Sequence, residues 1–187
     1  MNDCYVIIGS YRSGTSVIAK IMNSLGIDMS QRVNFTDNVD WYPTGSFNDR
    51  FSNYISTNPD TYWKLKIESN PIGKLGIRSF DYLKKNAWAK FTSQSKKSIN
   101  LIWANRNVVN CFNEYKFLIG KQAVPDIIEK QFETCQNIFN SFSNRKIIIN
   151  YSDLMQNTVL SAKQIADFCG VLYTDECVNE INPKYLE

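Results

Sequence analysis

GSYRSGTS, residues 9–16, is the stretch that decides the fold. It directly follows an apolar run of strand length at residues 4–8, and it opens into a helical pattern from Val17 to Leu25. A strand that turns through glycines into a helix leaves free backbone N–H groups at the helix N-terminus, where the helix dipole favours negative charge. The stretch therefore predicts a strand, an anion-binding loop and a helix.

The spacing of its two glycines is that of the nucleotide-binding loop G-x-x-x-x-G-K-[ST]. In that loop, backbone N–H groups surround the phosphates and the lysine reaches the β- and γ-phosphates. In this chain Thr15 stands at the lysine position, and a cation, Arg12, appears three residues earlier. The missing lysine argues against ordinary ATP or GTP hydrolysis.

The composition predicts a single domain with a well-buried core, and it excludes mechanisms that use histidine. The 187 residues are 43% hydrophobic, and the net charge of +3 is too small to favour a nucleic-acid or membrane partner. Histidine is absent, which removes imidazole bases and histidine-ligated metals, and we expect no metal. The five cysteines are scattered without a C-x-x-C pair, so we expect reduced cysteines in the core of a cytoplasmic protein.

Strand and helix patterns alternate along the chain. They predict an α/β fold of three layers, with a mostly parallel central sheet, helices on both faces and one domain over residues 1–187. Besides residues 4–8, strands are expected at 62–68, 99–104 and 146–150, the last of them fully buried. Further helices are expected near 48–55, over 80–91, 108–118 and 125–142, and around Leu160 up to a C-cap at Gly170. The remainder of 28–60 and residues 70–77 are expected to be irregular.

Two further polar motifs follow predicted strands, where ligands bind in an open parallel sheet. Arg106 follows the strand at 99–104, although an arginine in such a place is often a surface salt-bridge partner. Residues 151–154 (YSDL) follow the strand at 146–150, and there Ser152 or Asp153 is most simply a helix N-cap.

The three motifs, in the order in which they occur along the chain, resemble three motifs of the sulfotransferase family. Residues 12–16 (RSGTS) match the family's 5′-phosphosulfate loop, [KR]-S-G-T-[ST], at every position. Residues 102–117 resemble its strand-to-helix element for the 3′-phosphate, and residues 150–154 with 165–171 resemble its Y-E-D-L and F-L-G-V ending. A looser match, residues 45–49 (GSFND), resembles the G-x-[FW]-E segment of bacterial-type members.

The resemblance implies a P-loop-like fold and sulfuryl transfer from 3′-phosphoadenosine 5′-phosphosulfate to a hydroxyl or amine of a small-molecule or glycan acceptor. This donor has no γ-phosphate to require the missing lysine, and Arg12 would stabilise the charge that grows as the sulfuryl group departs. The residues that the resemblance places on the donor are Arg12, Ser13, Gly14, Thr15, Ser16, Arg106 and Asn113. Lys64, Lys66 and Arg78 are further candidates.

The chain departs from the family at two positions. Where the family has a serine eight residues after the arginine, this chain has Glu114, which would repel a phosphate unless it is paired or turned away, so Asn113 is the candidate beside it. At the glutamate of G-x-[FW]-E stands Asn48, which cannot accept a proton from an acceptor hydroxyl. We therefore expect Asp49 to be the general base, with Asp37 and Glu68 as alternatives; Asp49 could instead be a surface carboxylate.

Two other functions stay open on sequence alone. One is another P-loop enzyme, a nucleotide kinase or NTPase with a displaced cation. The other is a non-catalytic nucleotide-binding descendant of the fold. Aromatic residues between positions 35 and 63 mostly suit core packing, and a few could line an acceptor pocket.

Overall fold

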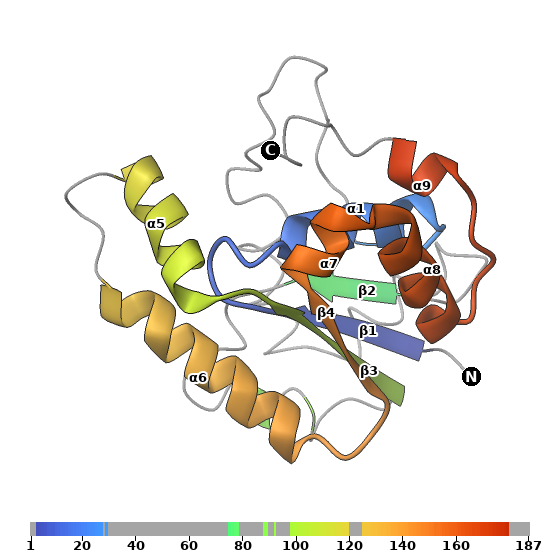
Figure 1. Ribbon diagram of the computed structural model, residues 1–187. Helices are drawn as coiled ribbons and strands as arrows, with labels where there is room; N and C mark the ends of the chain where they lie inside the picture. The colour runs from blue at the N-terminus through green and yellow to red at the C-terminus, as the bar shows by residue number, and fades with distance from the viewer. Residues whose placement is uncertain are drawn as a thin grey trace.

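The computed structural model describes residues 3–27, 29, 75–78, 88–89, 92, 98–119 and 125–179 (Figure 1). The expected strand at 62–68, the expected helix at 48–55 and most of the expected helix at 80–91 lie outside the described residues. Of that last helix, Trp88 and Ala89 are described and are helical, as is Thr92 just beyond its expected end.

Four parallel strands form the sheet in the described part of the chain. In sheet order they are β2 (Leu75–Arg78), β1 (Asp3–Ile8), β3 (Ser98–Asn105) and β4 (Lys146–Asn150). The register places Ile8 beside Trp103 and Trp103 beside Ile148. Because all four strands run the same way, the loops that follow β1, β3 and β4 emerge at one edge of the sheet.

Helices cover both faces of this sheet, which confirms the predicted three-layer α/β fold (Figure 1). On one face, Tyr5 and Ile7 pack against α1 (Thr15–Ser24) and α8 (Thr158–Cys169). The same face carries α7 (Tyr151–Gln156) and α9 (Glu176–Asn179). On the other face, Trp103 packs against α6 (Pro125–Ser141), and α5 (Val108–Ile119) lies against α6.

Residues 75–77, expected to be irregular, belong instead to β2. Leu75 to Arg78 pair in parallel with Cys4 to Ile7 of β1. Gly76 weakens the local strand pattern, but it lies opposite the fully buried Tyr5, and the hydrogen bonds of the sheet decide its conformation. The prediction for this segment was therefore wrong, because the strand depends on a distant partner.

Two details of the C-terminal half also differ from expectation. The strand at 146–150 is not fully buried: Ile149 is buried, but Ile148 on its opposite face is 37% exposed. The expected N-cap role of Ser152 or Asp153 was also wrong, because α7 already begins at Tyr151 and both residues lie within it.

The cysteines and the C-terminal end of α8 are as the sequence predicted. All five cysteines are free and buried, as expected from their scattered positions. Gly170 ends α8 in a left-handed conformation with φ 60°, as expected of a C-cap. Among the described residues, no helix has the length and apolar character needed to cross a membrane.

Candidate anion-binding site

The loop between β1 and α1 is folded tightly on itself. The Ser13 hydroxyl and the Ser13 backbone N–H both donate to the Ser10 carbonyl, at 2.8 and 3.2 Å. A Cβ at Gly9 would lie 2.7 Å from Thr15 Cγ2 and closer still to Ser13 Oγ, so only glycine fits there. Arg12, with φ 67°, and Gly14, with φ 93°, take the left-handed conformations that turn the chain into α1.

The N-terminus of α1 is left without a side-chain cap. Gly14 is the N-cap residue, its carbonyl accepts from Val17 and Ile18, and no side chain is hydrogen-bonded to the first turn as a cap. The first turn of α1 also carries no acidic residue. These backbone N–H groups and the positive end of the helix dipole are suited to bind an anion.

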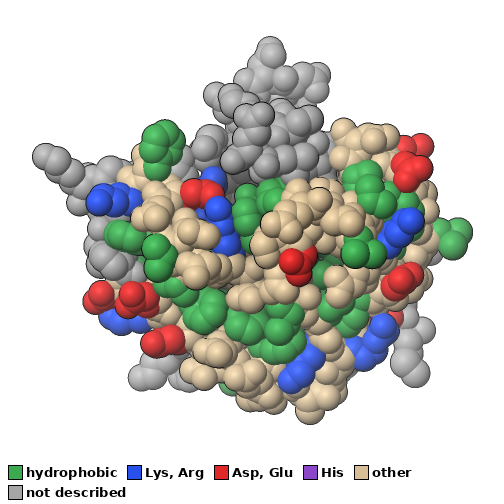
Figure 2. Space-filling view, viewed as in Figure 1, with side chains coloured by type: hydrophobic (Ala, Val, Ile, Leu, Met, Phe, Trp, Pro, Cys, Tyr) green, Lys and Arg blue, Asp and Glu red, His purple; other side chains and the backbone are tan. Residues whose placement is uncertain are grey.

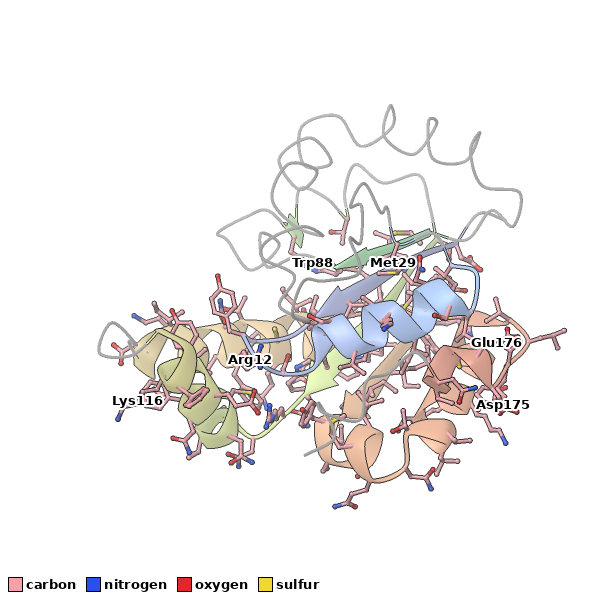
Figure 3. The ribbon with its side chains drawn as sticks, turned by 90° about the horizontal axis from the view of Figure 1, so that it is seen from above. Arg12, Met29, Trp88, Lys116, Asp175 and Glu176 are labelled. Atoms are coloured by element: carbon pink, nitrogen blue, oxygen red, sulfur yellow. The ribbon has the colours of Figure 1, made fainter. Side chains whose placement is uncertain are left out.

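Two guanidinium groups converge beside this N-terminus and share one carboxylate. Arg12 Nε and Nη2 contact Glu114 Oε2 at 3.1 and 3.0 Å, and Arg106 Nη2 pairs with the other oxygen, Oε1. Arg106 Nη1 donates to the Arg12 carbonyl at 2.9 Å. Figure 3 places Arg12 between the start of α1 and α5, and Figure 2 shows basic and acidic side chains in contact beside α5.

Tyr151 joins the third predicted motif to the same site. The Arg106 guanidinium carbon lies 3.9 Å from the centroid of the Tyr151 ring, in a cation–π contact. The ring also lies against Gly14, where a Cβ would lie only 2.6 Å from Tyr151 Cδ2. Burial raises the pKa of Tyr151, so its hydroxyl stays protonated at neutral pH. The three motifs that follow β1, β3 and β4 thus meet in space.

Contacts from α5 and α6 hold the far side of the loop. The Tyr11 backbone N–H donates to Gln131 Oε1 at 2.9 Å, and the Tyr11 and Tyr115 rings stack with centroids 5.6 Å apart. The Ser10 hydroxyl donates to Cys111 Sγ at 3.7 Å. Burial raises the pKa of the Cys111 thiol, which keeps it protonated and a poor nucleophile. Sequence reasoning missed Gln131 and Tyr115, because no local motif marks contacts between distant segments.

The predicted donor residues fall into two groups. Ser13 and Thr15 are buried and Ser16 is half-buried, all in the segment that follows Arg12; Asn113 is exposed on α5, where its neighbour Glu114 makes the contacts. The predicted base Asp49 lies outside the described residues, as do Asp37, Asn48, Lys64, Lys66 and Glu68. Arg78 belongs to β2, but its side chain is not described. Among the described residues, no three potential ligands cluster to hold a metal ion.

Comparison with solved structures identifies the fold. The sulfotransferase domain from the curacin biosynthetic pathway has a TM-score of 0.65 and 14% identity, with 97% of this chain and 78% of that chain covered. The sulfotransferase domain from the Synechococcus PCC 7002 olefin synthase has a TM-score of 0.60 and 15% identity, with the same coverage. No protein-family model and no curated protein matches the sequence. The chain therefore has a sulfotransferase-like fold, as its motifs predicted.

Proposed function

We propose that this protein transfers a sulfuryl group from an adenosine phosphosulfate donor to a hydroxyl or amine of a small-molecule or glycan acceptor. One observation carries the proposal: Arg12 and Arg106 converge beside the uncapped N-terminus of α1, at the carboxyl edge of a sulfotransferase-like sheet. The sequence resemblance implies that the donor is 3′-phosphoadenosine 5′-phosphosulfate.

The residues present fit the 5′ end of such a donor. Gly9 and Gly14 lie where a Cβ would collide with Thr15 and Tyr151, so the loop is compact and depends on glycine at both positions. The N–H groups at the start of α1 would bind the phosphosulfate, and Arg12 would lie beside them. With Thr15 in its place, the loop lacks the lysine that reaches the γ-phosphate in nucleoside triphosphate loops.

This arrangement supports transfer by positioning and electrostatic stabilisation. When bound, the donor supplies an activated sulfuryl group whose departure leaves negative charge on a phosphate oxygen. Arg12 and the α1 N-terminus would stabilise that charge, as cations and N–H groups do in phosphoryl transfer. Asp49 remains our proposed general base, which would accept the proton of the acceptor hydroxyl.

A second candidate, a nucleotide-binding protein without transferase activity, is favoured by one observation. Glu114 already pairs with both guanidinium groups, so part of their positive charge is neutralised within the protein. Donor binding and transfer must therefore be measured separately.

The test is transfer of a radiolabelled sulfuryl group to a panel of phenols, alcohols, sugars and amines, in buffer with EDTA. We expect a labelled product with the unmutated protein and none with Arg12→Ala. Arg145→Ala is the matched control. Arg145 directly precedes β4, so it lies at the amino ends of the strands, away from the loop, and it donates to the Phe168 carbonyl. Donor binding, measured by calorimetry, without any product would favour the second candidate, and absence of donor binding would refute the proposed transfer.

Asp49→Asn tests the base separately. It should abolish transfer while donor affinity stays within about threefold of the unmutated protein, because a base that acts on the acceptor does not contact the donor. Unchanged transfer would remove Asp49 from the mechanism.

A further inference from the structure

We infer that Glu114 makes this site select adenosine 5′-phosphosulfate over its 3′-phosphorylated form. The inference rests on the proposed function and names the donor class more closely. In the resulting reaction, the acceptor oxygen or nitrogen forms a bond to sulfur as the bond between sulfur and the bridging oxygen breaks. Adenosine 5′-phosphate leaves with that electron pair, and the acceptor proton passes to the general base.

The first support is the geometry of the carboxylate. Both oxygens of Glu114 are used: Oε2 contacts Arg12 at 3.0 and 3.1 Å, and Oε1 contacts Arg106. Within the part of the chain that the structure describes, two guanidinium groups and one carboxylate meet here and together carry a single net positive charge. A 5′-phosphosulfate needs one such cationic site, whereas a further phosphate dianion needs a second.

The second support is that Arg106 is already occupied by contacts within the protein. Its Nη2 pairs with Glu114, its Nη1 donates to the Arg12 carbonyl at 2.9 Å, and its flat face lies on the Tyr151 ring. Its side chain is only 14% exposed. A phosphate that approached Arg106 would have to displace the Glu114 carboxylate and would then lie beside it. Like charges in a partly buried place repel strongly, because water screens them poorly.

The third support is that the 5′ end of a donor does not depend on displacing Glu114. The N–H groups at the start of α1 belong to the loop and the helix, and no acidic side chain lies in that first turn. A nucleotide with only a 5′ anionic group can use them while the contacts between Glu114 and the two arginines persist. The charge balance of the site therefore favours the ligand with fewer phosphates.

The test compares adenosine 5′-phosphate with 3′-phosphoadenosine 5′-phosphate, which differ only in the 3′-phosphate. Calorimetry in EDTA measures both affinities for the unmutated chain, Glu114→Gln, Glu114→Ser and Glu176→Gln. Glu176→Gln is the matched control: it makes the same change in charge on α9, and Figure 3 shows it on the opposite side of the molecule from Arg12. Circular dichroism verifies the fold of each variant, and two variants at position 114 guard against one that does not fold.

We expect the unmutated chain to bind adenosine 5′-phosphate more tightly than the 3′-phosphorylated nucleotide. Either Glu114 variant should raise the affinity ratio in favour of the 3′-phosphorylated nucleotide by about tenfold, equivalent to about 1.4 kcal/mol, and Glu176→Gln should not change it. Equal affinity of the unmutated chain for the two nucleotides, or a preference for the 3′-phosphorylated one, would overturn the inference and leave the proposed function standing. An unchanged ratio in the folded Glu114 variants would do the same. If no variant binds either nucleotide, the proposed function fails and the inference fails with it.

Discussion

Gly14→Ala tests the contact at the centre of the site. Gly14 has φ 93° and ψ 10°, and an L-residue in a left-handed conformation costs roughly 1–2 kcal/mol. Its new Cβ would also lie 2.6 Å from Tyr151 Cδ2, so the ring must shift from the position in which it contacts Arg106. Overpacking of this kind costs about 1–3 kcal/mol. Together the two effects should lower the free energy of unfolding by about 2–5 kcal/mol.

Urea unfolding followed by tryptophan fluorescence measures this loss, with Gly170→Ala as the control. Gly170 is also left-handed, with φ 60°, but it caps the C-terminus of α8, so its substitution should cost only about 1–2 kcal/mol of backbone strain. A Gly14→Ala loss no larger than that of Gly170→Ala would refute the packing of Tyr151 against Gly14. In Tyr151→Ala, which removes the ring, Gly14→Ala should cost about 1–3 kcal/mol less than in the unmutated protein.

Three further predictions concern the surroundings of the site and the core. Arg106→Lys keeps the charge but loses the Tyr151 stacking and the second hydrogen bond, so unfolding in urea should show a loss of about 1–2 kcal/mol, and unchanged stability would contradict these contacts. Burial raises the pKa of Cys135 from 9.0 to about 12, so between these pH values the unfolded chain binds fewer protons and the free energy of unfolding should fall as pH rises. That fall should be shallower in Cys135→Ala, and equal slopes would count against the burial of this thiol. Finally, because all five cysteines are buried, dithionitrobenzoate should react with them only after denaturant is added; fast reaction of the native protein would be inconsistent with the structure.

The sequence predicted those parts of the site that depend on local patterns and on one rule of topology. The loop at residues 9–16 carries its own signals, since an apolar run precedes its glycines and a helical pattern follows them. Arg106 and Tyr151 could be expected beside it because the carboxyl ends of parallel strands meet at one edge of the sheet. The structure confirms that these segments converge.

What the sequence could not predict depends on contacts between distant segments. From the sequence, Glu114 was expected to repel a phosphate unless it was paired or turned away. Only the folded chain shows that its carboxylate bridges two arginines. The β2 strand needed its partner β1 to be recognised, because Gly76 interrupts the local pattern. Likewise, three consecutive isoleucines gave no indication that Ile148 would be partly exposed.

The central claim is that the loop before α1 and Arg12 bind a phosphosulfate nucleotide. Calorimetry with adenosine 5′-phosphosulfate and its 3′-phosphorylated form, in EDTA, tests it most directly on the unmutated chain and Arg12→Ala. We predict binding of at least one of these nucleotides without magnesium, weakened about tenfold or more in Arg12→Ala. No binding to the unmutated chain, or affinity that Arg12→Ala leaves unchanged, would contradict the claim.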